Sequence, residues 1–345
     1  MSHKPSETAN GLAHAPVAVL GAGSWGTALA IQFARAGHPT RLWSRNADDA
    51  AAMHAGRVNQ RYLPDARFPD EIAVHGDLAG AVSGAAAIII SVPSHALREL
   101  LTRLAPLLAR DARVAWATKG FELTTGKLPH QVAREVLGDE HPVAVLSGPT
   151  FAREVGLGLP TAMTIASTDH DYAAYLARAL HASNFRAYTS TDIVGVEVGG
   201  AVKNVLAVGA GLCDGLGFGA NTRIALITRG LSEVTRLGVA LGARVETFMG
   251  LAGLGDLVLT CTDNQSRNRR FGLALAAGKT PQQALQEIGQ VVEGYSAARA
   301  VHEVALREKV DMPIASGIYR ILYENQPAKD VVKDLMTRPI RAEVE

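Results

Sequence analysis

The chain of 345 residues contains few cysteines and few aromatic residues, and it carries almost no net charge. Its two cysteines, Cys213 and Cys261, form no CxxC pair and have no paired histidines nearby. This scarcity argues against both a disulfide framework and a zinc site. We therefore expect no metal, and we expect a reducing compartment, the cytoplasm.

The balance of charges and the lack of long apolar runs narrow the possible partners. The 34 basic and 33 acidic residues give a net charge of +1, so nothing points to nucleic acid or to an anionic membrane surface. The most apolar segment, Ala85–Val92, has only the length of a strand, so no membrane span is expected. Residues 1–16 are polar and contain no stretch of signal-peptide length, which indicates a disordered tail.

The first part of the chain alternates between short apolar runs and segments of helical periodicity. Such alternation predicts an α/β domain over residues 17–192, with a doubly wound, Rossmann-type parallel sheet covered by helices on both sides. The expected strands are Val17–Leu20, Thr40–Trp43, Ile72–His75, Ala87–Val92, Arg113–Thr118, Pro142–Leu146, Met163–Ala166 and Phe185–Tyr188.

After residue 192 the strand-like runs stop and helical periodicity dominates, so we expect an all-α second domain over residues 193–345. Ligands of open α/β sheets bind beyond the carboxyl ends of the strands, which predicts a cleft between the two domains. The expected helices are Val194–Leu212, Asn221–Leu241, Arg269–Ala276, Pro281–Ile288, Ser296–Lys309, Pro313–Tyr323 and Ala328–Met336.

A glycine-rich turn joins the first expected strand to the first expected helix. It reads Gly21-Ala22-Gly23-Ser24-Trp25-Gly26, a GxGxxG pattern. Gly21 permits a tight turn, Gly23 lets the backbone approach a pyrophosphate, and Gly26 lets the helix pack on the strand. Because a strand precedes the motif and a helix follows it, the pattern predicts dinucleotide binding.

The end of the second strand bears on which dinucleotide is bound. NAD-preferring folds usually place an acidic residue there to bind the ribose 2′-hydroxyl. Here the strand ends in Ser44-Arg45, and the first acids, Asp48 and Asp49, are expected in the next helix. A guanidinium suits a 2′-phosphate, although Arg45 could equally be an ordinary surface residue. We expect NADPH to be preferred and NADH to be usable.

Two lysines are candidates for chemistry. Lys119 follows an apolar strand and could donate to a substrate oxygen, or it could simply be solvated. Lys203 interrupts the apolar helical run Val198–Leu212. If it is buried, its pKa should fall, which suits general acid–base catalysis; the alternative is a side chain that extends to solvent from the helix edge.

The densest polar block, Gly253–Leu257 followed by Thr260–Arg270, is expected to enter a helix near Ser266. Free N–H groups at a helix start beside Arg267 and Asn268 would make an anion site of phosphate size. The alternative is a solvated basic surface. The loop Ser147–Ala152 is expected to face the cleft, whereas Gln290–Gly294 shows no chemistry by itself.

Seven segments, in the same order along the chain, resemble bacterial-type glycerol-3-phosphate dehydrogenase, and the resemblance covers about residues 17–325. It implies reversible reduction of dihydroxyacetone phosphate to sn-glycerol 3-phosphate with NADH or NADPH, which would supply glycerophospholipid synthesis. The segments are Gly21–Ala30, Ala117–Gly120, Ser147–Ala152, Gly199–Asn204, Gly253–Leu257, Asn264–Asn268 and Val291–Gly294.

The resemblance also implies residue roles, with Lys203 as the general acid–base. The implied substrate-binding residues are Lys119, Gly148, Thr150, Lys203, Asn204, Asp256, Ser266, Arg267 and Asn268. The implied cofactor-binding residues are Gly21, Gly23, Ser24, Trp25, Gly26, Arg45, Lys119, Ala152, Arg267, Val291 and Glu293.

Two other functions stay open. One is a two-domain dehydrogenase of the same architecture that acts on a different hydroxy acid or sugar acid. The other is a non-catalytic NAD(P)H sensor that signals through the helical domain. The Ser266-Arg267-Asn268 block favours a small phosphorylated substrate over the first, and the presence of both Lys203 and Asp256 argues against the second. We expect a homodimer.

Overall fold

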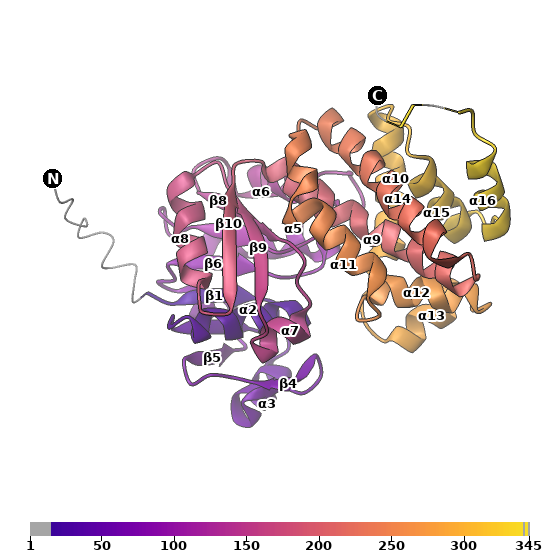
Figure 1. Cartoon of the computed structure of the whole chain (residues 1–345). Coiled ribbons are helices and arrows are strands. Elements are labelled where there is room, and N and C mark those ends of the chain that lie inside the picture. The colour runs from indigo at the N-terminus through magenta and orange to yellow at the C-terminus, as the bar shows by residue number, and fades with distance from the viewer. Residues whose placement is uncertain (1–14, 341, 344–345) are drawn as a thin grey trace.

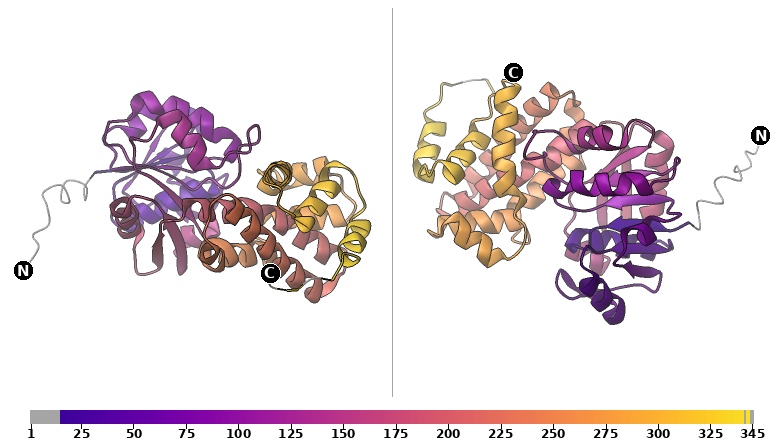
Figure 2. Two further views of the ribbon diagram at one scale, coloured as in Figure 1. Left: turned by 90° about the horizontal axis from the view of Figure 1, so that it is seen from above. Right: turned by 180° about the vertical axis from the view of Figure 1, so that it is seen from behind.

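The computed structural model describes residues 15–340 and 342–343. The tail expected over residues 1–16 therefore lies almost entirely outside the described residues. The described chain forms a sheet domain followed by a helical domain, which lie side by side (Figures 1 and 2). The predicted architecture, a doubly wound sheet followed by an all-helical part, is confirmed.

The sheet has eight strands in the order β10-β9-β8-β7-β6-β1-β2-β5. The chain passes from β1 to β2 and β5 on one side and then returns to β6 on the other, so the order reverses beside β1. That reversal is where such sheets bind ligands. The strands are β1 (Val17–Leu20), β2 (Thr40–Trp43), β5 (Ile72–His75), β6 (Ala87–Ile90), β7 (Val114–Trp116), β8 (Val143–Ser147), β9 (Thr161–Ala166) and β10 (Phe185–Ser190).

The sheet is parallel except at one pair, β8 and β9, which run antiparallel with Val145 opposite Ala166. The sequence analysis expected a wholly parallel sheet. The connection between these strands contains only the six-residue helix α7 (Ala152–Leu157). The chain turns back after β8, and β10 follows β9 in the same direction.

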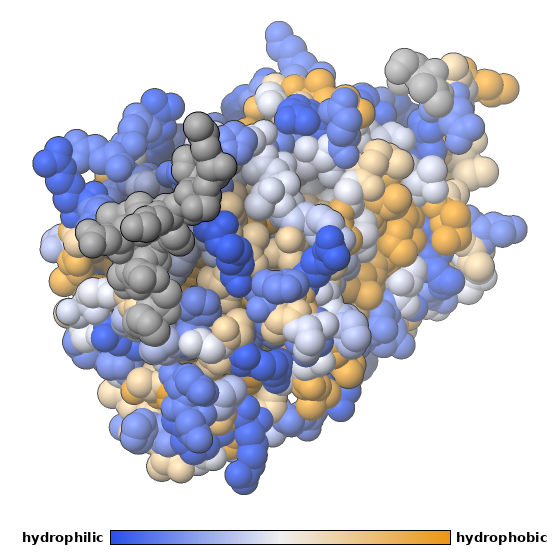
Figure 3. Space-filling view, turned by 60° about the vertical axis from the view of Figure 1, so that its left-hand side comes forward, coloured by the Kyte–Doolittle hydropathy of each residue, from blue (hydrophilic) through white to orange (hydrophobic). Residues whose placement is uncertain are grey.

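Helices cover both faces of the sheet, and alternate strand residues point into two separate cores. In β1, Val17 and Val19 pack into one core, whereas Ala18 and Leu20 pack into the other. On the outside, Figure 3 shows hydrophobic residues in separate groups among hydrophilic ones. The helices are α2 (Ser24–Arg35), α3 (Ala47–Gly56), α4 (Leu78–Val82), α5 (Leu97–Leu104), α6 (Pro129–Leu137), α7 and α8 (His170–Leu180).

A small antiparallel hairpin, β3 (Val58–Asn59) and β4 (Leu63–Arg67), lies beside α2 and α7. The sequence analysis assigned no element to this stretch. Its strands are too short to show a clear alternation of apolar and polar residues.

The helical domain is built around α9 (Ile193–Gly215), which contacts most of the other helices. By length and composition α9 could cross a membrane, which the sequence analysis did not recognise; however, 94% of its apolar window is buried inside the structure, as in a core helix. The others are α10 (Gly219–Ala240), α11 (Asp256–Thr262), α12 (Arg267–Ala276), α13 (Pro281–Ile288), α14 (Glu293–Arg307), α15 (Pro313–Tyr323) and α16 (Ala328–Met336).

Glycines let α9 and α12 touch backbone to backbone. A Cβ atom on Gly272 would lie 2.1 Å from Val208 O, and one on Gly211 would lie 2.1 Å from Arg269 O. No larger residue fits at either position without moving a helix. The crossing fixes α12, and therefore the start of that helix, relative to α9.

Candidate active site

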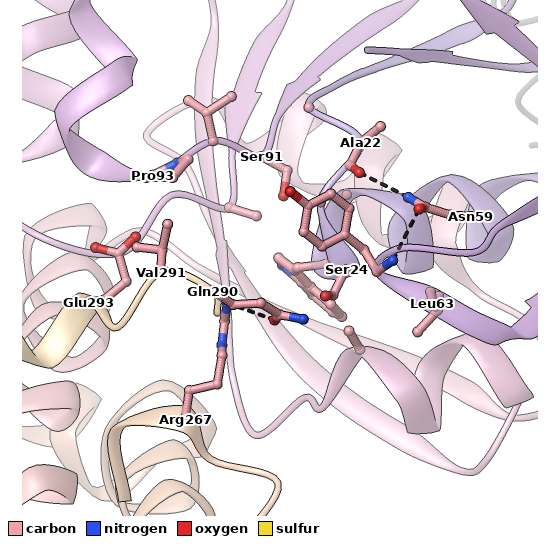
Figure 4. A pocket seen from close by; sticks show the side chains of 18 of the residues that line it. Ala22, Ser24, Asn59, Leu63, Ser91, Pro93, Arg267, Gln290, Val291 and Glu293 are labelled. Carbon is pink, nitrogen blue, oxygen red and sulfur yellow. Dashed lines mark hydrogen bonds between the residues drawn. The ribbon is translucent and has the colours of Figure 1, made fainter. Parts of the chain in front are cut away.

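A cleft of about 1770 Å³ lies between the two domains. Its walls come from the carboxyl ends of β1, β2 and β6, from the hairpin β3–β4, and from α9, α11, α12 and the turn before α14. Figure 4 shows the two sides: Ala22, Ser24 and Ser91 from the sheet domain face Arg267 and Glu293 from the helical domain. The cleft is larger than a typical pocket for one small ligand.

The glycine-rich loop between β1 and α2 presents open backbone to the cleft. Gly21 has φ +116°, and a Cβ on Gly26 would lie 1.9 Å from Gly21 O, so both positions require glycine. A Cβ on Gly23 would meet nothing within 4 Å. No side chain caps α2, whose N-cap residue is Gly23, so the first N–H groups of the helix are left for an anion.

At the end of β2, Arg45 is exposed on the cleft wall. It makes no hydrogen bond or ion pair with any other described residue. The nearest acids, Asp48 and Asp49, lie in the first turn of α3. Their backbone N–H groups donate hydrogen bonds to the side-chain oxygen of Asn46, the N-cap residue. At the end of β2 the cleft wall therefore presents the Arg45 guanidinium to a ligand. The two acids belong to the first turn of α3 and do not form an ion pair with it.

Three charged side chains from distant parts of the chain meet at the floor of the cleft. Lys203 on α9 donates to Asp256 and, at 3.0 Å, to the hydroxyl of Thr260. Lys119 donates to the other oxygen of Asp256 at 2.6 Å and to Gly148 O at 3.4 Å. Asp256 is only 1% exposed, so a single buried carboxylate orients both lysines.

Burial tunes these groups in opposite ways. Burial lowers the pKa of Lys203 to about 7, although the neighbouring Asp256 carboxylate partly opposes the shift. Burial by itself would raise the pKa of Asp256, but the Lys119 and Lys203 ammonium groups outweigh it and the pKa is lowered. At neutral pH the site therefore holds an ionised carboxylate beside a lysine that can gain or lose a proton.

Small residues allow this close approach. A Cβ on Gly200 would lie 3.4 Å from Lys119 Cγ, and one on Gly199 would lie 2.6 Å from Ala252 O, just before α11. Gly148 has φ +152° and is not part of the cleft wall; its carbonyl accepts hydrogen bonds from Lys119 and, at 3.2 Å, from Thr150. The loop after β8 thus supports the lysine from behind.

The start of α12 faces the cleft as predicted. Ser266 is the N-cap, and its hydroxyl accepts from Arg269 N at 3.2 Å. Asn268 donates to the Asn204 side chain at 2.9 Å and accepts from Gly294 N at 2.8 Å. One amide therefore connects α9, α12 and the start of α14.

The Arg267 side chain lines the cleft at the start of α12. Its guanidinium donates to Gln290 Oε1 at 3.3 Å, and burial lowers its pKa, opposed by Glu293. Burial in turn raises the pKa of Glu293 to about 7, opposed by Arg267. Val291, between Gln290 and Glu293 in sequence, is 44% exposed on the cleft wall.

The structure brings the predicted site residues together, with Gly148 behind the wall rather than in it. The three neighbouring arginines of α12 differ in position: Arg267 and the exposed Arg270 both line the cleft, whereas Arg269 is buried and bound to Asp214 at 2.5 Å. In the described part of the chain, no three His, Cys, Asp or Glu side chains are grouped as metal ligands would be.

Three buried polar residues near the site were not foreseen. Thr260 bonds Lys203, and Asn59 bonds the glycine-rich loop. Glu197, six residues before Lys203, accepts from Trp116 Nε1 at 2.8 Å and from His130 N at 2.9 Å. Glu197 thus joins α9 to the strand that leads to Lys119. Glu197 could have been found from the sequence, because it is a charged residue in an apolar helix, as Lys203 is.

Family models of the N- and C-terminal parts of NAD-dependent glycerol-3-phosphate dehydrogenase match residues 16–173 and 192–333. The chain is 55% identical over 328 residues to the glycerol-3-phosphate dehydrogenase [NAD(P)+] of Pseudoalteromonas translucida, covering 95% of this chain and 98% of that protein. It is 56% identical over 323 residues to the protein of the same name from Aeromonas hydrophila, with 93% and 97% covered.

Among solved structures, the glycerol-3-phosphate dehydrogenase of Coxiella burnetii is similar with a TM-score of 0.91 and 47% identity. The alignment covers 94% of this chain and 99% of that one. The similarity therefore extends through both domains and across the cleft between them.

Proposed function

This chain belongs to the NAD-dependent glycerol-3-phosphate dehydrogenase family, and we propose on that premise that it reversibly reduces dihydroxyacetone phosphate to sn-glycerol 3-phosphate. The observation that carries the proposal is Lys203, a buried lysine with a pKa near 7, between the glycine-rich loop and the start of α12. A dehydrogenase needs a proton donor of that kind beside its carbonyl substrate.

The glycine-rich loop fits a dinucleotide. The open space at Gly23 and the uncapped start of α2 suit a diphosphate, and the exposed Arg45 suits a ribose 2′-phosphate. We assign cofactor contact to Gly21, Gly23, Ser24, Trp25, Gly26, Arg45, Lys119, Ala152, Arg267, Val291 and Glu293. NADPH is the preferred cofactor and NADH is usable, in keeping with the NAD(P)+ in the relatives' names.

When bound, the reduced nicotinamide supplies a hydride to the carbonyl carbon of the substrate. The ammonium of Lys203 stabilises the negative charge that develops on the carbonyl oxygen and donates the proton that completes the alcohol. In the reverse direction the neutral amine takes that proton back. Because its pKa is near 7, Lys203 serves in both directions at neutral pH.

Asp256 and Lys119 orient the reacting groups. The Asp256 carboxylate holds the Lys203 ammonium in place and partly opposes the fall in its pKa. Lys119, on the other oxygen of Asp256, presents a second ammonium at the same cleft floor for the substrate oxygens. Thr260 donates its own proton to Asp256 O at 2.6 Å, which leaves its oxygen free to accept from Lys203.

The start of α12 holds the substrate phosphate. Arg267 supplies a guanidinium, and the first N–H groups of the helix supply further donors beside Ser266 and Asn268. Phosphate held there fixes the ketone near Lys203, so its binding energy contributes to the rate as well as to affinity. The remaining substrate contacts fall to Lys119, Thr150, Asn204 and Asp256, and Gly148 acts indirectly, because its carbonyl holds Lys119 from behind the cleft wall.

Several wider assignments go with this activity. The product supplies glycerophospholipid synthesis in the cytoplasm. The sheet domain ends at residue 192, between β10 and α9.

The protein works as a homodimer. Exposed apolar side chains of the helical domain are available for a subunit contact, among them Ile224, Val239, Val245 and Met249. Sedimentation velocity measures the subunit number.

The test is the initial rate of NADPH and NADH oxidation with dihydroxyacetone phosphate, compared with unphosphorylated dihydroxyacetone. The proposed function requires turnover of the phosphorylated ketone, with a much higher kcat/KM than for the unphosphorylated one. Equal rates with both ketones would favour a different hydroxy-compound dehydrogenase. Cofactor binding without oxidation would favour a sensor.

A further inference from the structure

The hairpin β3–β4 places one buried amide beneath the glycine-rich loop. Asn59 is 3% exposed; its Nδ2 donates to Ala22 O at 2.9 Å and to the Thr27 hydroxyl at 2.8 Å. Its Oδ1 accepts from Tyr62 N at 3.2 Å. Figure 4 shows Asn59 directed at Ala22, on the wall opposite Arg267. The amide thus makes three hydrogen bonds to three different segments.

The bond to Ala22 O acts on the turn that we assign to the diphosphate. The peptide between Ala22 and Gly23 is planar and trans, so its C=O and its N–H point in opposite directions. Because Asn59 holds the carbonyl, the N–H of Gly23 is directed away from the hairpin. No acceptor among the described residues binds that N–H. It is therefore left, in a fixed direction, for a ligand.

The other two bonds extend this effect. Thr27 is fully buried in the first turn of α2 and donates its N–H to Gly23 O at 3.0 Å, so Asn59 holds both ends of the turn. Tyr62 belongs to the hairpin turn, which lines the cleft together with Gln60 and Arg61. One amide therefore ties the cleft wall formed by the hairpin to the wall formed by the glycine-rich loop.

We propose that Asn59 is a positioning residue for the dinucleotide. It holds the glycine-rich loop and the hairpin turn in the arrangement that receives the diphosphate, and it does not touch the ligand itself. The inference rests on the cofactor binding assigned above. A purely structural role would instead make Asn59 a clamp for the hairpin, whose loss lowers stability and leaves cofactor affinity unchanged.

The experiment compares Asn59→Ala with the wild type by equilibrium fluorescence titration of NADPH without substrate, followed by steady-state kinetics. We expect the Kd and the KM for NADPH to rise about ten-fold, as for the loss of a net-stabilising hydrogen bond. At saturating NADPH, kcat and the KM for dihydroxyacetone phosphate should stay within about two-fold, because Asn59 acts only through the cofactor loop.

Three further variants separate positioning from stability. Asn59→Asp has the same size and keeps an acceptor for Tyr62 N, but when ionised it cannot donate, so it should weaken NADPH binding at least as much. Thr27→Val removes one bond and spares the bond to Ala22 O, so its Kd should change less than about three-fold. Asn184→Ala is the matched control, since Asn184 bonds Gly158 O at 2.5 Å outside the cleft.

The inference is overturned if Asn59→Ala binds NADPH like the wild type while its Tm falls as far as that of Asn184→Ala. Should Asn59→Ala fail to fold, the same comparison is made with Asn59→Asp. The titration needs no turnover. A wild type that binds NADPH but does not reduce dihydroxyacetone phosphate would therefore overturn the proposed function and leave the result on Asn59 intact.

Discussion

The two walls of the cleft present different kinds of group to a ligand. At the end of β1 the sheet-domain wall is mostly backbone, a glycine-rich turn and an uncapped helix start, and its arginines, among them Arg45, Arg61 and Arg103, are exposed. The helical-domain wall is made of charged side chains taken out of water, namely Lys203, Asp256, Arg267 and Glu293. The shape of the backbone wall is determined by local chain conformation. The arrangement of the charged wall is determined by ion pairs between residues that are far apart in sequence.

The difference has a chemical consequence. Backbone N–H groups have fixed polarity and suit a ligand that is bound and released unchanged in charge, such as a diphosphate. Buried ionisable groups can change protonation, as a reaction at a carbonyl requires. Changes in the charged wall should therefore affect turnover, and changes in the backbone wall should affect cofactor binding.

The largest effect is expected for Lys203→Ala. Loss of a general acid–base group should lower kcat by roughly 10²–10⁴-fold, because the alkoxide loses both its counter-charge and its proton donor. The Kd for NADPH, measured by fluorescence titration, should stay close to that of the wild type. A kcat within two-fold of wild type would remove Lys203 from the mechanism.

Arg267→Ala should have the next largest effect. The loss of one charge-assisted contact with the phosphate should reduce kcat/KM for dihydroxyacetone phosphate by roughly ten- to a hundred-fold. Turnover of unphosphorylated dihydroxyacetone should fall much less. Arg178→Ala, which removes an exposed arginine outside the cleft, is the control. If both ketones lost activity equally, Arg267 would not be the phosphate anchor.

Arg45→Asp tests the exposed guanidinium that follows β2 in sequence. It removes an attraction for the 2′-phosphate and adds a repulsion, so the KM for NADPH should rise about ten-fold while that for NADH changes little. The ratio of the two KM values is the measurement. An equal rise for both cofactors would mean that Arg45 contacts the adenine or nothing, and the NADPH preference would be withdrawn.

The smallest effect is expected from pH. In the proposed mechanism ketone reduction needs protonated Lys203. Because the pKa of this lysine is about 7, kcat for reduction should fall as pH rises, about three-fold between pH 6.5 and 7.5. Alcohol oxidation needs the neutral amine and should rise over the same interval. Asp256→Asn removes the carboxylate that opposes the fall in this pKa, so both profiles should move to lower pH. A kcat independent of pH across this range would contradict the assignment.

The sequence was informative where a residue's role depends on its neighbours in the chain. Gly21 and Gly26 are required by the turn that contains them, and Lys203 was visible as a charge in an apolar helix. The reversal of strand β9 could not be foreseen from its residues. The direction of a strand does not alter its pattern of apolar residues.

Contacts between distant residues were also beyond the sequence pattern. Asp256 and Lys119 are separated by 137 positions, and Asn59 and Ala22 by 37. Arg267 and Arg269 are alike in sequence, but two helical positions turn them by about 200° relative to each other. One therefore faces the cleft and the other binds Asp214.

The close crossing of α9 and α12 at their glycines fixes how far apart side chains on the two helices lie. Lys203 belongs to the first of these helices and Arg267 to the second, and backbone contact at Gly211 and Gly272 prevents the helices from closing further. The span between the proposed proton donor and the proposed phosphate anchor is thus set before a ligand arrives. A phosphorylated ketone with one more carbon between carbonyl and phosphate would be longer than this span and could engage both ends only by bending, so the fold itself would select the length of the substrate.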